Sequence, residues 1–197
     1  MCRLFESIRI ENGIMQHRAL HEMRMNDSRS LLFGKTKHLT LKDISIPHEF
    51  LNGVFKCRVV YQDEIETVEF LPYEIRAIST VALVEANSIL YNHKYLDRSQ
   101  FDEIRKQRPE CDELIIVKDG YLTDSTYSNI AFFDGVNWFT PSNPLLKGVR
   151  RQSLLNSKEI TEMLIPSTGL NKYITLSFIN AMMDLGDVVL NIQDAIK

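Results

Sequence analysis

The chain has 197 residues, of which 44% are hydrophobic and 25% are charged, so it can bury one substantial core or two small ones, and disordered and fibrous classes are excluded. Its 26 acidic and 23 basic residues give a net charge of −3 without a long block of either sign, which argues against nucleic-acid binding and favours small-molecule partners. No apolar run approaches the roughly 18 residues of a membrane span, so we expect no membrane association.

Cysteine and histidine usage points to a cytoplasmic protein without a metal centre. The three cysteines are far apart and form no CxxC pair, which is typical of reduced thiols. The first residues lack an apolar signal core, because the carboxylate of Glu6 follows at once. His17 and His21 stand four residues apart like a helical ligand pair, but the nearest acidic residue, Glu22, points elsewhere. We therefore expect solvated helix histidines and no bound metal.

The first third of the chain predicts a strand, a turn and a helix. Apolar and polar residues alternate over 4–10 as in a half-buried strand, and Asn12-Gly13 is typical of a hairpin turn. Residues 17–32 predict a helix that stops at Gly34, since glycine readily adopts the left-handed conformation of a helix end. The expected apolar face of this helix comprises Leu20, Met23, the Ser28/Leu31 side and Leu32.

The next segment predicts an irregular stretch followed by a sheet. The residues from Thr36 to Pro47 are mostly polar and predict irregular structure. Three strand-like runs follow, at 54–61, 65–71 and 75–84. They predict an antiparallel meander with a bend or domain boundary at Pro72-Tyr73.

The second half begins with a predicted helix and a hairpin. A solvated helix is expected over 98–108 and a buried strand over 114–117, and Asp119-Gly120 is a strong hairpin turn. A second hairpin is expected where Asp134-Gly135 stands between two further strands. These two strands are predicted at 130–133 and 138–139.

The remaining residues predict one further helix and then mixed short elements. The stretch 150–155 is amphipathic and follows Gly148, so a helix is expected with its N-terminus near Val149. Taken together, the elements predict an α+β fold of two lobes. The smaller lobe, residues 1–75, combines an antiparallel sheet with a helix, and the larger lobe, residues 76–197, is rich in strands.

Five positions could carry chemistry, although four of them have an ordinary explanation when taken alone. Lys94 could be a solvated charge, Asp124 a turn residue, Arg24 a helix-surface cation and Asn180 a helix cap. Gly148 is the most informative, because the free backbone N–H groups at a helix N-terminus form an anion site, especially for a phosphate. The order of these positions along the chain strengthens the case for a common site.

Several segments resemble, in order, the motifs of the class IV (fold-type IV) pyridoxal-phosphate enzymes. Residues 5–9 (FESIR) and 21–24 (HEMR) resemble the segment "FET-R…H-x-x-R". Residues 94–98 (KYLDR) resemble the catalytic-lysine block "K-x-L-N-R" in the compact form of aminodeoxychorismate lyases and D-amino-acid transaminases. Residues 120–151 match the signature "G-x-l-t-E-x-x-x-S-N-i…T-P…L-x-G-i-x-R" in order and spacing. On these motifs the chain is identified as a member of this family.

The resemblance implies the two-lobed fold-type IV architecture, the cofactor pyridoxal 5′-phosphate and a role for each matched residue. Lys94 is the catalytic lysine, which binds the cofactor covalently and carries the proton of the substrate Cα. Asp124 keeps the pyridine nitrogen protonated, and Arg24 adds charge to the phosphate site. The implied cofactor-binding residues are Arg24, Lys94, Asp124, Gly148, Val149, Arg150 and Asn180.

Two substitutions and the length depart from the family pattern. Asp124 stands where the family usually has Glu, which shortens the reach to the ring nitrogen, and Asp97 stands where the lysine block usually has Asn. The chain is also shorter than is usual in the family, so the loops that would define the substrate pocket are reduced.

Two reactions and a non-catalytic role remain open at this point. The compact lysine block and the NAMM sequence at 180–183, which resembles the "NALM" stretch of aminodeoxychorismate lyases, favour a lyase that releases pyruvate and 4-aminobenzoate. The alternatives are an aminotransferase and a homologue that binds the cofactor without turnover. Arg58 could bind a substrate carboxylate, although an exposed strand cation explains it as well. The resemblance also implies a homodimer and a small amino-group substrate.

Overall fold

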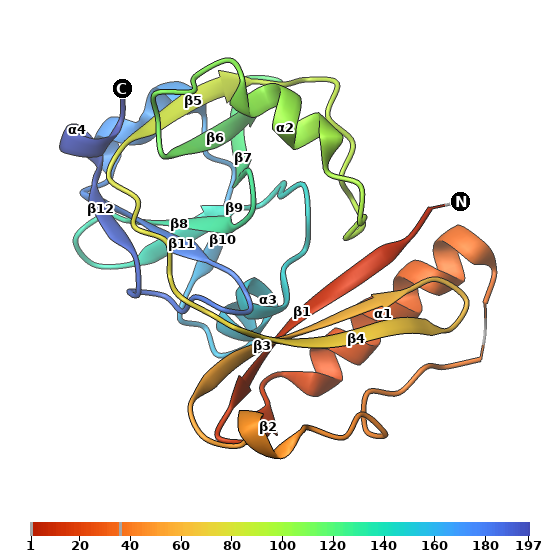
Figure 1. Ribbon diagram of the computed structural model, residues 1–197. Helices are drawn as coiled ribbons and strands as arrows, with labels where there is room; N and C mark the ends of the chain where they lie inside the picture. Colours follow the sequence, from red (N-terminus) through yellow and green to blue (C-terminus); the bar gives the residue numbers. More distant parts are fainter. Residues whose placement is uncertain (1, 36) are drawn as a thin grey trace. The chain divides into compact units, whose positions relative to one another are not determined.

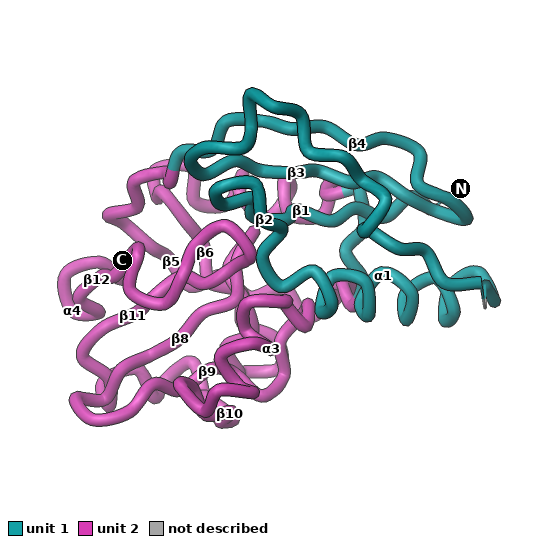
Figure 2. The backbone as a smooth tube through the Cα atoms, turned by 90° about the horizontal axis from the view of Figure 1, so that it is seen from below, with its two compact units in different colours: residues 1–74, 93–97 teal, residues 75–92, 98–197 magenta. Residues whose placement is uncertain are grey.

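The computed structural model describes residues 2–35 and 37–197, and the chain divides into two compact units that are shown in different colours in Figure 2. Unit 1 comprises Met1–Glu74 and His93–Asp97, and unit 2 comprises Ile75–Asn92 and Arg98–Lys197. The division after Glu74 lies one residue from the boundary expected at 75. The return of His93–Asp97 to unit 1 was not expected from the sequence.

Unit 1 is built on an antiparallel sheet with the strand order β2-β1-β3-β4. Asn12 and Gly13 have positive φ angles of 49° and 75° and form the two-residue turn between β1 and β2, which confirms the predicted hairpin. The strands are β1 (Leu4–Glu11), β2 (Ile14–Met15), β3 (Val54–Tyr61) and β4 (Ile65–Pro72).

Helix α1 (Arg18–Phe33) packs on this sheet and contacts β1 (Figure 1). The helix ends where Gly34 adopts a φ of 65°, as predicted. Alternate residues of β1 are buried, and they meet Met25 from α1 and residues from β3 in the core. The buried core of unit 1 comprises Leu4, Ile8, Ile10, Met25, Leu39, Leu41, Cys57, Val59 and Tyr61.

The predicted apolar face of α1 was wrong. Met23 and Leu31 are 51% and 77% exposed, and the buried positions of the helix are largely polar. Arg29 explains the difference, because its guanidinium donates to the backbone oxygens of Lys37 at 2.7 Å and Asp63 at 2.6 Å. Hydrogen bonds to neighbouring loops therefore decide which face is buried. The buried residues of α1 are His21, Met25, Asn26, Ser28 and Arg29.

The segment between α1 and β3 is irregular, as predicted, but it is not purely solvated. Thr36, the first residue of the predicted irregular stretch, lies outside the described residues. Leu39 and Leu41 are buried, and the Asn26 side chain bonds both backbone groups of Leu39, at 2.8 and 2.9 Å. A short 3-10 helix, η1 (His48–Phe50), precedes β3.

The first sheet of unit 2 corrects the predicted meander. Residues 75–80 form no strand, and β5 (Val81–Glu85) pairs in parallel with β6 (Glu113–Lys118) rather than with β4. The reason lies at Ser79 and Thr80, whose backbone N–H groups donate to the carboxylate of Asp112 and so leave the strand conformation. Strand β7 (Tyr121–Ser125) pairs antiparallel with β6 through the predicted Asp119-Gly120 turn.

The second sheet of unit 2 has the strand order β10-β9-β8-β11-β12. The predicted Asp134-Gly135 hairpin is confirmed, because β8 and β9 pair antiparallel across it. The strands are β8 (Asn129–Phe133), β9 (Trp138–Pro141), β10 (Thr161–Met163), β11 (Thr175–Ile179) and β12 (Val189–Asn191). Helix α3 (Val149–Asn156) packs Leu154 against Ala131 and Ile179 of this sheet.

Short helices complete unit 2. Helix α2 (Ser99–Arg105) is shorter than the predicted 98–108, because Pro109 disfavours helical backbone in the residue before it. Its Phe101 and Ile104 are buried, so the expectation of a fully solvated helix was wrong. The others are η2 (Ser167–Lys172) and α4 (Ile192–Ala195). The mixture of sheets and helices confirms the α+β class. Within the described ranges, no helix has the length and apolar character to cross a membrane.

Candidate active site

Lys94 lies beside the N-terminal half of β1 in unit 1. The backbone N–H of Phe5 donates to the Lys94 carbonyl at 3.0 Å, and that of Leu96 donates to the Arg3 carbonyl at 2.8 Å. The Lys94 ammonium, Nζ, stands 4.7 Å from the centroid of the Phe5 ring, a cation–π distance. Backbone hydrogen bonds thus hold the main chain at Lys94, and the ring contact orients its half-buried side chain.

The Phe5 ring brings Lys94 and Arg58 to the same neighbourhood. Cζ of Arg58, on β3, lies 5.7 Å from the ring centroid, and its guanidinium is 3.4 Å from the Glu69 carboxylate. Arg58 is therefore a partly exposed strand cation with an acidic neighbour. Its predicted role in binding a substrate carboxylate stays a prediction.

A buried carboxylate, Glu6, holds Arg24 on the other side of β1. Glu6 has no exposed surface and receives hydrogen bonds from Arg24, from Nε at 3.1 Å and from a terminal nitrogen. Its second neighbour is His21 Nδ1, at 2.6 Å. The Tyr61 hydroxyl lies at 3.4 Å. The arginine predicted to bind phosphate is thus positioned by an ion pair from the sheet to α1.

The charges in this cluster are set by burial and by the partners. Burial raises the pKa of Glu6, but the charge of Arg24 and the hydrogen bonds from His21 and Arg24 outweigh it and bring the pKa to about 2. Burial lowers the pKa of His21, and the charges of Arg24 and Lys94 act in the same direction, against the opposing contact with Glu6. A negative Glu6, a neutral His21 and a positive Arg24 therefore coexist at neutral pH.

The expectation of solvated helix histidines was wrong for His21. Its side chain has no exposed surface, and its Nε2 has no hydrogen-bond partner. The signal was present in β1, where Glu6 is in phase with the buried Leu4 and Ile8 and so had to point into the core. A carboxylate on that face requires polar partners from the helix that covers it.

In unit 2, Asp124 and Asn129 form the centre of a second polar cluster. Asp124 is 5% exposed and lies on β7, and Asn129 begins β8. The Asn129 side chain donates to Asp124 Oδ1 at 2.7 Å and to the Leu146 carbonyl at 2.8 Å. The Leu146 N–H donates to Asp124 Oδ2 at 2.9 Å. Neutral donors from two segments therefore fix the orientation of the carboxylate.

Burial is the dominant influence on the acidity of Asp124. It raises the pKa of this carboxyl to about 6, against the smaller opposing effects of the Leu146 and Asn129 hydrogen bonds and the charge of Arg151. At pH 7 the Asp124 carboxyl is therefore largely ionised. Its hydrogen-bond partners described above are neutral groups and not cations. Such a carboxylate is well suited to bind a protonated ring nitrogen.

Gly148 allows helix α3 to start against this cluster. A Cβ atom at this position would lie 2.0 Å from Asn129 Oδ1, so only glycine permits the close approach. Gly148 is the N-cap of α3 and, as a glycine, has no side chain with which to cap the first turn. The Arg150 guanidinium bonds Asp184, with Nε at 2.8 Å from the carboxylate.

Asn180 follows β11 and closes a tight turn. Its Oδ1 accepts from the N–H groups of Met182 at 2.8 Å and Met183 at 3.0 Å. Its Nδ2 donates to Ser128 Oγ at 2.9 Å, next to Asn129 in the chain. The structure therefore brings Asp124, Gly148 and Asn180 together through Asn129 and Ser128, two residues to which the sequence assigned no separate role.

These donors fit the chemical demands of pyridoxal phosphate, which needs an amine, an acid for its ring nitrogen and an anion site for its phosphate. Within unit 1, Lys94 is an amine and Arg24 is a cation held by Glu6. Within unit 2, Asp124 is a buried acid and helix α3 begins directly after Gly148. Next to Arg24, the buried Nε2 atom of His21 has no hydrogen-bond partner.

The comparisons with known proteins agree with this chemistry. The sequence profile of the family "Amino-transferase class IV" matches residues 58–190. A protein of Haemophilus influenzae (strain ATCC 51907 / DSM 11121 / KW20 / Rd) is 35% identical over 188 residues, which are 94% of this chain and 100% of that protein.

Solved structures resemble the chain over nearly its whole length. A crystal structure described as that of a candidate 4-amino-4-deoxychorismate lyase from Haemophilus somnus 129pt has a TM-score of 0.83 at 30% identity, and the match covers 94% of this chain and 98% of that one. A candidate amino-acid aminotransferase from Mesorhizobium loti has a TM-score of 0.79 at 20% identity, with 97% and 99% covered. The short length is therefore shared with these proteins.

A longer protein shares the fold. A hypothetical aminotransferase from Mycobacterium tuberculosis in its pyridoxal-phosphate-bound form has a TM-score of 0.72 at 14% identity, with 98% of this chain and 81% of that one covered. The family profile spans more than half of the sequence, and the motifs around the lysine, the acid and the helix N-terminus stand within it. The chain belongs to the class IV aminotransferases, a family of pyridoxal-phosphate-dependent enzymes.

Proposed function

We propose that the protein uses pyridoxal 5′-phosphate to eliminate pyruvate from 4-amino-4-deoxychorismate and release 4-aminobenzoate. The observation that carries the choice of reaction is the likeness, at 30% identity and almost full length, to the candidate lyase of Haemophilus somnus. The compact lysine block and the residues 180–183 point in the same direction.

The roles of the site residues follow from their chemistry. Lys94 is the amine that binds the cofactor and takes the proton from the substrate Cα. Asp124 holds a proton on the ring nitrogen, and Asn129 and Leu146 hold Asp124 in place. The bound cofactor supplies an acceptor for the electron pair that remains at Cα.

Anion binding falls to a different set of groups. The N–H groups of Val149 and Arg150 follow Gly148 at the start of α3 and bind the phosphate, and Arg24 adds a positive charge. Asn180 closes this phosphate cup beside Ser128. Arg58, near Lys94 through the Phe5 ring, is the candidate for the substrate carboxylate.

The competing reaction is amino transfer to a 2-oxo acid. Both reactions begin when Lys94 removes the Cα proton, and they differ in the next step. The lyase breaks the bond to the enolpyruvyl oxygen, whereas the transferase must return the proton to a different carbon and release an oxo acid. Elimination competes with the slower proton delivery only where the bond to the leaving group is aligned with the electron pair that remains at Cα. The family name and the Mesorhizobium loti structure favour the transferase.

Two parallel assays decide between these reactions. The purified protein is loaded with pyridoxal phosphate and given 4-amino-4-deoxychorismate, and we expect 4-aminobenzoate fluorescence together with an equal amount of pyruvate. The second assay offers D- and L-amino acids with 2-oxoglutarate. Amino transfer without an aromatic product would replace the lyase with the transferase. Bound cofactor with neither product would favour the non-catalytic alternative.

We also propose a cytoplasmic homodimer. The thiols of Cys2, Cys57 and Cys111 are all unpaired, which suits a reducing compartment. The dimer is expected from the resemblance, because a neighbouring subunit helps to wall the pocket in this family.

A further inference from the structure

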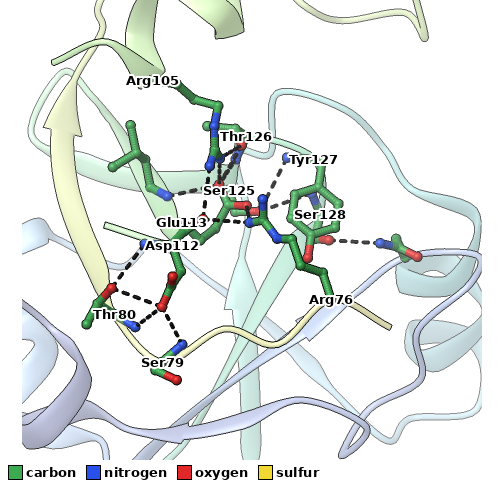
Figure 3. A network of polar contacts seen from close by, with 12 residues as sticks. Arg76, Ser79, Thr80, Arg105, Asp112, Glu113, Ser125, Thr126, Tyr127 and Ser128 are labelled. Carbon is green, nitrogen blue, oxygen red and sulfur yellow. Dashed lines mark hydrogen bonds and ion pairs between the residues drawn. The ribbon is translucent and has the colours of Figure 1, made fainter. Parts of the chain in front are cut away.

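A third buried carboxylate, Glu113, lies at the start of β6 and has no exposed surface. Its Oε2 accepts from Arg76 at 2.9 Å, and its Oε1 accepts from Arg105 at 3.3 Å. Figure 3 shows these side chains converging on Glu113 from two sides. The site described above uses none of these three residues.

Glu113 also accepts hydrogen bonds from Thr126, which lies at the tip of the turn formed by residues 125–128. Oε1 accepts from the Thr126 hydroxyl at 2.5 Å and from the Thr126 N–H at 3.2 Å (Figure 3). Arg105 donates to the same hydroxyl at 3.1 Å, and Arg98 donates to the Thr126 carbonyl. Every polar group of Thr126 is therefore bonded to this cluster, and the residue is only 3% exposed.

This turn, residues 125–128, connects the cofactor acid Asp124 to its hydrogen-bond partner Asn129. Asp124 directly precedes it and Asn129 directly follows it, and their side chains are 2.7 Å apart. The turn is closed by the Ser125 N–H, which donates to the Ser128 carbonyl at 2.8 Å. The turn therefore links the position of its tip to the geometry between Asp124 and Asn129.

A cation–π contact adds a second attachment. The Arg76 guanidinium, which binds Glu113, also stands 5.3 Å from the centroid of the Tyr127 ring. Glu113 thus holds Thr126, and its partner Arg76 contacts the next residue of the turn, Tyr127. The exposed Asp112 next to Glu113 bonds Ser79 and Thr80 instead (Figure 3).

We infer that Glu113 is a positioning residue for the cofactor site: by anchoring Thr126 it fixes the 125–128 turn, and so holds Asp124 against Asn129 in the orientation that meets the ring nitrogen. The consequence for the cofactor rests on the proposed function. The mechanical part, from Glu113 through the turn to Asp124, is a property of unit 2 alone.

The test monitors the titration of the Asp124 carboxyl by NMR in the full-length protein without cofactor, with Asp124→Asn identifying the signal. Glu113→Gln removes the charge, and Thr126→Val removes the hydroxyl contact with Glu113 at unchanged charge. Loosening the turn admits water to Asp124, and since burial is the larger influence on this carboxyl, we expect both variants to lower its pKa by about one unit. Asp112→Asn, the matched loss of a neighbouring charge, should leave it unchanged.

Each outcome decides the inference. An unchanged Asp124 titration in both variants would overturn it, and a change in Glu113→Gln alone would assign the effect to charge and also overturn it. If Glu113→Gln does not fold, Thr126→Val decides. In a separate experiment, each protein is titrated with pyridoxal phosphate and binding is followed by the visible absorbance. We expect both variants to bind the cofactor about tenfold more weakly than the parent. Failure of the parent to bind the cofactor would refute the proposed function and leave the NMR result standing.

Discussion

At the scale of single residues, the contact between Gly148 and Asn129 makes a sharp demand on the sequence. We expect Gly148→Ala to destabilise the protein by roughly 1–3 kcal/mol, because the new methyl group would overlap Asn129 Oδ1, which lies 2.0 Å from its position. Urea unfolding measures the loss. The same substitution in an Asn129→Ala background should cost far less, since the obstructing amide is gone. Equal costs in both backgrounds would contradict this account.

Lys94 gives the second prediction at this scale. The parent protein, incubated with pyridoxal phosphate and reduced with borohydride, should carry the cofactor on the peptide that contains Lys94. Lys94→Ala should lose the label and nearly all turnover, because no other amine is expected to replace it. Lys56→Ala on β3 is the control and should label normally. Mass spectrometry of the digested protein identifies the lysine, and a label elsewhere in the parent would show that another amine binds the cofactor.

The sequence indicates the residues of the candidate site, but it does not indicate the residues that hold them in place. Lys94, Asp124 and Gly148 stand at fixed spacings in recognisable motifs. Asn129 was part of the same motif, yet its close approach to Gly148, 19 residues further along the chain, arises only in the folded protein and is not revealed by spacing alone. Glu113 is more remote still, because it acts on the turn through hydrogen bonds that only the folded sheet creates.

At the scale of elements, the ion pair between β1 and α1 sets a stability prediction. Glu6→Gln should cost about 3 kcal/mol, because the positive Arg24 would lose its charged partner in a largely buried cluster. Glu66→Gln is the matched control, since Glu66 forms only a surface pair with Arg3 at 3.8 Å and should change stability by less than about 1 kcal/mol. Urea unfolding near neutral pH measures both.

The same pair fixes the sign of a pH dependence. The pKa of Glu6 is about 2 in the folded protein and 4.5 as a free side chain, so its stabilising contribution is complete above pH 4.5 and is lost as the pH falls towards 2. Unfolding free energies measured across this range should fall more steeply in the parent than in Glu6→Gln. Parallel curves for the two proteins would mean that Glu6 is not held ionised by its partners.

Elements were predicted best where local signals dominated. The three hairpin turns that contain Asn-Gly or Asp-Gly and the start of α3 after Gly148 follow from local backbone preference. The strand expected over 75–84 forms only from Val81 on, because Ser79 and Thr80 bond Asp112, more than 30 residues away. The predicted buried face of α1 was wrong for the same kind of reason. Hydrogen bonds to loop carbonyls, and not apolar periodicity, determine which face of the helix is buried.

At the scale of the whole molecule, the dimer is open to a direct measurement. Multi-angle light scattering at micromolar concentration, with pyridoxal phosphate present, should give twice the mass of the 22.8 kDa chain. Dilution should reduce turnover as the subunits separate. A monomer with full activity at the same concentration would contradict the proposed assembly and leave the family membership unaffected.

The return of residues 93–97 to unit 1 has a consequence for how the protein is made. Leu4 of β1 pairs with Tyr95, and the Phe5 N–H bonds the Lys94 carbonyl, so unit 1 is incomplete until residue 97 has left the ribosome. By then residues 75–92, which belong to unit 2, have already emerged. The first residues of unit 2 are therefore synthesised before unit 1 can be completed, and the segment that completes unit 1 is the one that contains Lys94.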